Sequence, residues 1–251
     1  LQEVLTKIAA ERLKAADDME KRNDTFRLSR VLQEALEAQE RLTTLDPKDK
    51  KAEADRDATK KRLAESLKKD AEKHIAETDK VESQNKPDED RKVLGRREQG
   101  IEILQQAKAQ APDDKEIDRK IQEEQSKMSN LITKRAEEKI VPALAKEKAG
   151  SGELAALDRG RQDLAKAVEL DPNNTKAKDL KAKAEERLEK EILAQAKNNL
   201  AAAERQTDPR SKLRSATGAS EQFQKVQDIN PESQPAKEGL EKVGAMLPEL
   251  H

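Results

Sequence analysis

The sequence contains no cysteine, no tryptophan and no tyrosine, and its only aromatic residues are Phe26 and Phe223. Without cysteine, the chain can form no disulfide bond and offers no thiolate for catalysis or metal binding. Because large aromatic side chains are scarce, most of the core must come from leucine, isoleucine, valine and alanine, so we expect a thin core. Cysteine-free chains are compatible with reducing and oxidising compartments alike, so cytoplasmic and periplasmic locations both stay open.

Residues that usually carry catalysis or bind metals are also scarce. His74 and His251 are the only histidines and lie far apart in the sequence, which argues against a histidine metal site or a catalytic triad. No glycine-rich phosphate-binding loop is present. The acidic run 113–116 lacks the glycine and alternating oxygen ligands of a calcium loop, so we interpret it as a helix cap. We therefore predict no enzyme activity, no cofactor, and no catalytic, cofactor-binding or metal-binding residue.

A dominant charge and a long apolar run are both absent. Lysine and arginine number 51 and aspartate and glutamate 52, so the chain has no overall attraction to nucleic acid, and it lacks aromatics to stack on bases. The basic cluster Lys60-Lys61-Arg62 lies among acidic residues, and we interpret it as a solvated helix face. No apolar run approaches the roughly 20 residues that span a bilayer. We expect a soluble chain whose partners are other proteins, without nucleic-acid binding or membrane insertion, and for which self-association is possible.

What the sequence does have is helical periodicity. Charged residues make up 41% of the chain and are interspersed with alanine and leucine, a composition typical of long helices. In the segment 163–175, Leu164, Ala167 and Val168 recur at helical spacing, and Pro172 then ends the helix. Asn174 is a residue type that caps a new helix by accepting hydrogen bonds from its first amides. This segment therefore ends one helix, turns, and starts another.

The same joint recurs at prolines 47, 112, 172 and 231, which are separated by 65, 60 and 59 residues. Regular spacing of this kind indicates repeated supersecondary units. Aligned on the proline, the four copies carry a small residue twelve positions before it: Ala35, Gly100, Gly160 and Ala219. A residue that favours helix N-caps stands two positions after it: Asp49, Asp114, Asn174 and Ser233.

Apolar residues keep one register in all copies, which predicts a continuous core stripe. Eight positions before the proline stand Gln39, Leu104, Leu164 and Phe223, and three of these are apolar. Five positions before it stand Leu42, Ala107, Ala167 and Val226. Sixteen positions after it stand Leu63, Met128, Leu188 and Leu247. The residues Leu1, Leu5, Ala9 and Leu13 fit the register of the segment 188–200, so we expect the chain to begin inside a long helix.

The pattern predicts eight helices and a truncated ninth, paired as antiparallel hairpins. Their expected bounds are 2–21, 25–45, 49–82, 88–110, 114–148, 152–170, 174–206 and 210–229, with the ninth starting at 233. Pro142 falls inside the helix expected at 114–148, where we predict a kink. Two matches to the glycosylation pattern, at 23–25 and 173–175, fall where a turn favours asparagine, and we interpret both as turn residues.

We interpret residues 1–251 as a single repeat array. Its approximate units are 1–47, 48–112, 113–172 and 173–231, followed by a partial unit at 232–251. Both ends of the chain fall inside an expected helix, and neither carries the polar capping element with which solenoids usually end. We therefore expect the chain to be a fragment of a longer protein.

The shorter helix of each unit resembles the second helix of a tetratricopeptide repeat. Gly160, Leu164, Ala167 and Pro172 match that pattern best, within the string Ala-Val-Glu-Leu-Asp-Pro-Asn-Asn. The resemblance implies an all-α fold of antiparallel hairpins stacked as an extended solenoid. Members of that family bind peptides or proteins on their concave side, but no residue of this chain matches their ligand-binding positions. The resemblance covers about half of each unit, because the period here is near 60 residues rather than the usual 34 and the aromatic and glycine pattern of the family's first helix is missing.

We predict a non-catalytic scaffold or adaptor that binds other proteins, because regular helical repetition occurs here without any catalytic constellation. Two alternatives remain open at this point. The chain could be a structural spacer or self-assembling helical rod, or a sensor module attached to an enzyme in a longer protein. The style of the sequence suggests a bacterial origin.

Overall fold

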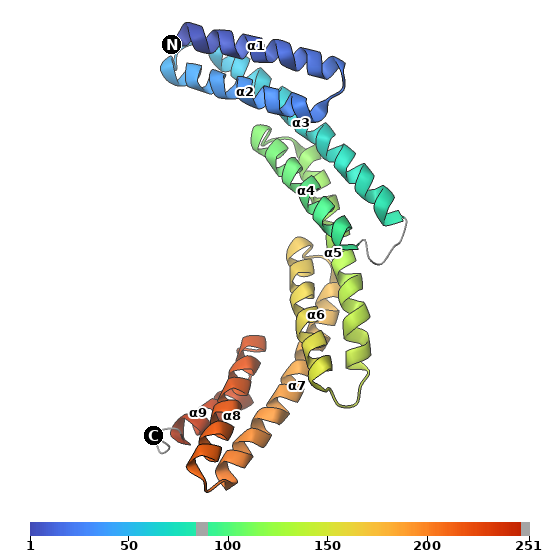
Figure 1. Ribbon diagram of the computed structural model, residues 1–251, viewed down its shortest axis with the longest axis vertical. Helices are drawn as coiled ribbons and strands as arrows, with labels where there is room; N and C mark the ends of the chain where they lie inside the picture. The colour runs from blue at the N-terminus through green and yellow to red at the C-terminus, as the bar shows by residue number, and fades with distance from the viewer. Residues whose placement is uncertain (84–89, 247–251) are drawn as a thin grey trace. The chain divides into compact units, whose positions relative to one another are not determined.

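The computed structural model describes residues 1–83 and 90–246. Within these residues the chain forms helices and no strand, which confirms the all-α fold (Figure 1). The helices are α1 (Gln2–Lys21), α2 (Thr25–Leu45), α3 (Lys50–Ser83), α4 (Asp90–Gln110), α5 (Lys115–Leu144), α6 (Ser151–Leu170), α7 (Thr175–Arg205), α8 (Pro209–Ile229) and α9 (Gln234–Met246). Most bounds lie within two residues of those expected from the sequence. The expectations for Pro87, Leu247 and His251 lie outside the described residues.

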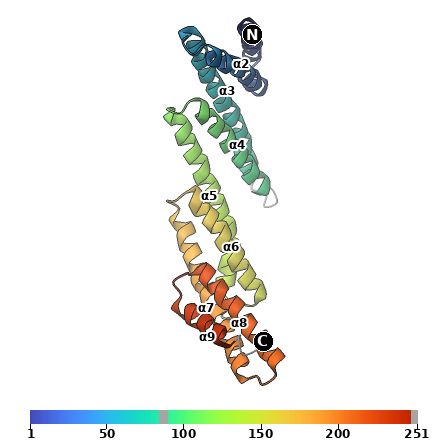
Figure 2. The same ribbon diagram turned by 90° about the vertical axis from the view of Figure 1, so that its left-hand side faces the viewer.

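The helices form two compact units, Leu1–Met128 and Ser129–His251, and α5 contributes to both. In the first unit, α2 packs against α1 and α3, and α3 packs against α4. In the second unit, α7 packs against α6 and α8, and α9 packs against α8. Figures 1 and 2 both show α3 beside α4 and α7 beside α8, as neighbouring antiparallel helices. Helical hairpins therefore build both units, as predicted.

All four joint prolines sit in the same turn. The amide two positions after the proline donates to the carbonyl oxygen of the residue before it, over 3.2, 3.1, 3.0 and 3.1 Å in chain order. The residues before Pro47, Pro172 and Pro231 have φ of −136°, −137° and −133°. Proline forces this departure from helical geometry, because its ring clashes with a helical residue at the preceding position. The equivalence of the joints, predicted from spacing alone, is confirmed.

Side-chain caps start the next helix at three of the four joints. The Asp49 carboxylate accepts from the amides of Lys51 and Ala52, over 2.9 and 3.1 Å. Asp114 and Asn174 accept hydrogen bonds at the corresponding helix starts. The prediction is wrong for Ser233, whose buried hydroxyl makes no hydrogen bond among the described residues. There the helix begins on main-chain hydrogen bonds, such as that from Ala236 N–H to the Ser233 carbonyl.

The predicted stripe forms the core of both units. Residues buried at the aligned positions include Ala35, Leu63, Leu104, Ala107, Gly100, Gly160, Leu164, Ala167, Leu188, Phe223 and Val226. Small residues let neighbouring helices approach closely at equivalent points of the two units. A Cβ atom on Gly100 would lie 3.2 Å from Ile75 Cγ1, and one on Gly160 would lie closer than 3.0 Å to the side chain of Ile140. These pairs occupy the same repeat positions, so the copies share packing as well as spacing.

One helix is shorter than the sequence predicted. We expected the helix containing Pro142 to kink there and to continue to residue 148, but α5 ends at Leu144. Proline has no amide hydrogen and its ring clashes with the carbonyl four residues earlier, so it weakens the turn that contains it. The amide of Ala145 still donates to the carbonyl of Val141, over 3.1 Å, and the helix then stops. A proline in the middle of a helix bends it, but Pro142 lies so near the end of α5 that the helix stops instead.

The two glycine environments generate a stability prediction. Gly160→Ala places a methyl group against the buried Ile140 side chain, and overpacking of this kind typically costs about 1 to 3 kcal/mol. Gly95→Ala is the matched control, because nothing lies within 4 Å of its added Cβ and alanine stabilises a helix interior by up to about 1 kcal/mol relative to glycine. Urea denaturation should therefore move in opposite directions for the two variants. A Gly160→Ala protein as stable as wild type would contradict the close packing.

Candidate functional site

The residues that the sequence offered as candidates for a metal site or for glycosylation lie within a helix or at helix caps. His74 is half-buried in α3, and its main-chain carbonyl accepts from the Thr78 hydroxyl over 2.7 Å. Asn23 adopts a left-handed conformation with φ 56°, and Asp24 caps α2 by accepting from Arg27 N–H. Asn174 caps α7, so the turn interpretation is confirmed at both matches to the glycosylation pattern.

The basic cluster on α3 is engaged in ion pairs at the surface. Arg62 lies 2.7 Å from Asp17 and 3.0 Å from Glu20, both on α1. Lys60 lies 3.6 Å from Glu40 on α2. Lys61 is exposed, whereas Lys60 and Arg62 are half-buried and are balanced by carboxylates of adjacent helices, so the cluster is only partly the solvated face that the sequence predicted. Among the described residues, no helix is long and apolar enough to cross a membrane, and no group of metal-ligating side chains is large enough to hold a metal ion.

An apolar groove opens between α2 and α4, with α3 as its floor. We call it the Phe26 groove; its volume is about 580 Å³, and it is lined by Phe26, Leu63, Leu67, His74, Ile103 and Ala109, among others. Leu63 is fully buried, whereas the Phe26 ring is 73% exposed at the start of α2. The other aromatic residue, Phe223, is buried in the second unit. The groove therefore displays the one exposed aromatic side chain of the described residues beside an apolar floor.

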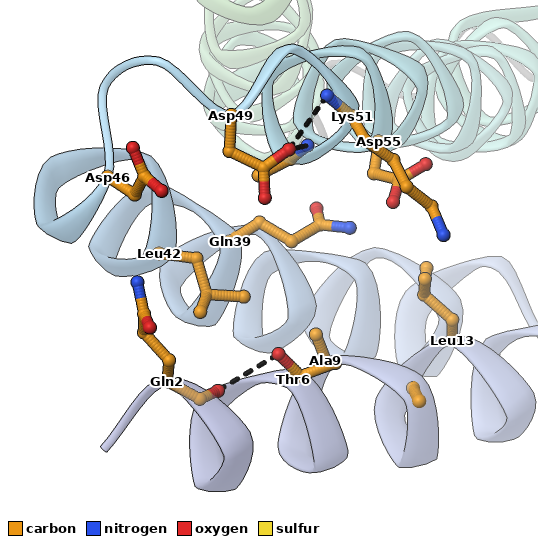
Figure 3. A pocket seen from close by; sticks show the side chains of 12 residues that line it. Gln2, Thr6, Ala9, Leu13, Gln39, Leu42, Asp46, Asp49, Lys51 and Asp55 are labelled. Atoms are coloured by element: carbon orange, nitrogen blue, oxygen red, sulfur yellow. Dashed lines mark hydrogen bonds between the residues drawn. The ribbon is translucent and has the colours of Figure 1, made fainter.

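A second hollow lies between α1, α2 and the first turns of α3 (Figure 3). We call it the Gln39 pocket, and its volume is about 440 Å³. Ala9, Leu13 and Leu42 contribute apolar surface to its wall. Gln39 reaches into it from α2, Asp49 lines it from the turn before α3, and Asp55 lines it from α3. The pocket thus combines an apolar floor with polar side chains from two helices.

The first unit also contains a buried ion cluster centred on Arg97 of α4. The Arg97 side chain is only 1% exposed and pairs with Asp79 at 2.7 Å and with Glu82, both on α3. It also pairs with Glu124 of α5, which is itself buried and lies 2.7 Å from Lys127. The cluster ties three helices together through charge-assisted hydrogen bonds.

Hydrogen bonding keeps the Arg97 guanidinium charged. Burial alone lowers the pKa of Arg97, but the hydrogen bonds to Glu82 and Asp79 and the charge of Glu124 raise that pKa above its ordinary value. Burial likewise lowers the pKa of Lys127, and its hydrogen bond to Glu124 reverses the effect and raises it. Both cations therefore stay protonated at neutral pH, and the cluster holds its charges as fixed structural elements.

The repeat alignment contains the signal for this cluster, although our sequence reasoning missed it. Fifteen positions before the joint proline stand Leu32, Arg97, Leu157 and Ala216. Twelve positions after it stand Thr59, Glu124, Ala184 and Val243. All eight residues are buried. One copy thus carries an ion pair at positions where the other copies carry no charge.

A polar network surrounds the Pro172 joint, in the second unit. The Asn174 side chain donates from Nδ2 to the hydroxyl oxygens of Ser129, at 2.8 Å, and Thr133, at 3.1 Å. The Ser129 hydroxyl donates in turn to the Ala167 carbonyl, over 2.7 Å. Because each buried polar atom of this network has a partner, the network closes the joint and leaves no group for a ligand to satisfy.

The outer face of α1 exposes a stripe of aliphatic side chains. Leu1, Val4 and Ile8 are 82%, 57% and 40% exposed, and their spacing places them on one side of the helix. At the aligned positions of later copies, Val4 corresponds to Ser66 and Leu131, which are buried, and to Glu191, which is half-buried. Ile8 aligns with Asp70, Arg135 and Gln195, none of which is buried, so only part of the stripe occupies positions that are buried elsewhere in the protein.

The buried ion cluster generates a second prediction. Arg97→Leu removes the cation but leaves Glu124 buried, and breaking a buried pair on one side typically costs about 3 to 5 kcal/mol. Combining Arg97→Leu with Glu124→Ala reproduces the residues Leu157 and Ala184 of the next copy. Urea denaturation should show that the double variant recovers most of the loss. A single variant as stable as wild type, or a double variant no better than the single, would contradict the assignment.

Comparison with known proteins assigns the chain to no family. No protein-family model and no curated protein matches the chain. Among solved structures, it is similar to a chain from the computational design of self-assembling cyclic protein homo-oligomers, at 14% identity over 99% of this chain and 95% of that one, with a TM-score of 0.26. It is also similar to a de novo designed helical repeat protein, at 17% identity over 99% and 92%, with a TM-score of 0.19. At these scores the likeness carries no conclusion about function.

Proposed function

We propose that this chain is a non-catalytic scaffold of tetratricopeptide-like helical repeats that binds another protein in the Phe26 groove. The single observation that carries the proposal is the exposed Phe26 ring beside an apolar floor. Aromatic side chains dominate the binding energy of many protein interfaces, because they bury a large rigid surface at little entropic cost. A chain with only two aromatic residues gains nothing for its core from a phenylalanine that it leaves in solvent.

The chemistry of the groove favours an apolar segment of a partner protein. Leu67 and Ile103 are half-buried in its wall and retain apolar surface for contact. The charged residues that line it are Arg30 and Asp70, which are opposite in sign. A partner therefore needs no strong net charge, and apolar side chains on one face of a helix or extended segment fit such a groove.

The outer face of α1 favours a second function, assembly with further copies of the chain. In the first unit, Ser66 of α3 is buried and shares a 2.8 Å hydrogen bond with Ser29 of the neighbouring α2. Val4 holds the aligned position on α1 but is exposed. A helix of a second copy could cover Leu1, Val4 and Ile8 in the way that α2 covers Ser66, which would build an assembled rod.

Mutation of the groove tests the scaffold. Phe26→Ala should leave stability within about 0.5 kcal/mol of wild type, because the ring is mostly exposed, but should lower the recovery of protein partners at least about fivefold. Quantitative affinity capture from extracts measures the recovery, and Val141→Ala is a matched control because that side chain is exposed on α5. Equal recovery by wild type and Phe26→Ala, or no partner together with measurable turnover, would contradict the proposal.

Light scattering tests the assembled rod. The mass of the wild-type chain should rise with protein concentration if α1 binds a second copy, and Ile8→Lys should suppress the rise because it desolvates a charge in the contact. Val141→Lys, which places the same charge on an exposed position of α5, should leave the rise unchanged. A mass that stays monomeric over the whole concentration range would rule out assembly through this face.

A further inference from the structure

We propose that the Gln39 pocket binds a protonated primary amine carried on a short aliphatic chain. The site lies within the first unit, between α1, α2 and α3, and shares no lining residue with the Phe26 groove. The inference is therefore independent of the function proposed above. Three observations carry it: an unsatisfied buried amide, an excess of carboxylates, and an apolar floor of suitable size.

The first observation is the state of Gln39. This residue is 4% exposed, and its Oε1 atom is buried and has no hydrogen-bond partner among the described residues. Figure 3 shows the amide directed into the space between α2 and the start of α3. A buried carbonyl oxygen without a donor destabilises the fold, so an N–H donor from a ligand is favoured there.

The repeat alignment shows that Gln39 is an exception in the core stripe. The residues at its position in the other copies are Leu104, Leu164 and Phe223, and all three are buried. Leucine is a usual residue type at a buried core position such as this one, because its side chain needs no hydrogen bond. The first copy therefore carries a polar group at a position where the fold itself requires none.

The corresponding joint of the second unit, at Pro172, is bridged by a side-chain hydrogen bond. There Thr133 and Asn174, which align with Thr6 and Asp49, are joined by a 3.1 Å hydrogen bond. In the first unit, Thr6 donates to the carbonyl of Gln2 over 2.9 Å, and Asp49 accepts from the amides of its own helix, just as Thr133 and Asn174 do in theirs. The Asp49 carboxylate, however, has no N–H with which to reach Thr6 as Asn174 reaches Thr133. The space between the two helices is left open, and it forms the Gln39 pocket (Figure 3).

The second observation is the charge of the lining. Asp46, Asp49 and Asp55 line the pocket with only one cation, Lys51, so the lining carboxylates exceed the ammonium groups by two. Lys51 does not neutralise these carboxylates, since it forms no ion pair among the described residues. Together with a carbonyl acceptor, an acidic lining selects a cation that donates several hydrogen bonds, and a primary ammonium group donates three.

The third observation is the floor. Ala9, Leu13, Leu42 and Ala52 present apolar surface to the pocket, which suits the methylene groups of an alkyl chain. The volume of about 440 Å³ leaves room for a diamine or polyamine with bound water. The same chemistry is found in two sources, a free polyamine and the lysine side chain of a protein, and the experiment below separates them.

Isothermal titration calorimetry on the full chain tests the site with defined probes. Cadaverine and spermidine represent free amines, a doubly blocked lysine amide represents a protein side chain, and pentanol is the uncharged control. We expect saturable one-to-one binding of at least one amine, weakened by salt because charge contributes, and no binding of pentanol. Tighter binding of the free amines identifies a polyamine as the source, and tighter binding of blocked lysine identifies a protein side chain.

Variants separate the site from the fold. Gln39→Leu copies the residue found in two other repeats, so it should fold at least as stably as wild type and lose amine affinity at least about tenfold. Asp55→Asn should weaken binding and flatten its salt dependence, whereas Asp179→Asn on α7 should change neither. Absence of saturable binding by every amine, or affinity unchanged in a folded Gln39→Leu protein, would overturn the proposal and leave water as the occupant of the pocket.

Discussion

The turn at each joint proline fixes where the helices of both units end and begin. Proline excludes helical geometry from the residue before it, and a single main-chain hydrogen bond then closes the turn in all four copies. Because the turn is the same each time, the helices that leave it start in the same register. Core residues twelve positions before and sixteen positions after the proline can then recur as one buried stripe, although they share little identity.

A shared frame explains why the copies can differ in chemistry without differing in fold. Arg97 and Glu124 are buried at positions that are uncharged in the other copies, and Gln39 is buried where the others carry leucine or phenylalanine. The Arg97 guanidinium pairs with Asp79, Glu82 and Glu124, so it acts in structure, although its buried Nε has no hydrogen-bond partner among the described residues. Gln39 leaves an acceptor without a partner, so it is the substitution that points to a ligand. A polar departure from the stripe points to a ligand where it also borders an open pocket, as Gln39 does.

Much of the fold could be predicted from the sequence, because helical periodicity and proline geometry are local properties. The helix bounds, the joints and three of the four caps followed from residues close together in the chain. The end of α5 at Leu144 could not be predicted in this way, and neither could the unpartnered Ser233 hydroxyl. Each depends on which hydrogen bonds form within a single turn. The hollows beside Phe26 and Gln39 depend on which side chains from several helices fail to fill a space. The spacing of residues in one sequence does not show which spaces between helices stay unfilled. The alignment of the four copies did show that Gln39 is the one polar residue at its repeat position.

The most direct test of the repeated joint is the NMR coupling between the amide and α protons of Asp46, Ala111, Asp171 and Asn230, the residues that precede the four prolines. A φ near −135°, as found before Pro47, Pro172 and Pro231, gives a large coupling, whereas a helical residue gives a small one. The account predicts large couplings of similar size at all four positions. A small, helical coupling at any of them would show that the copies do not share one turn and would contradict the common frame.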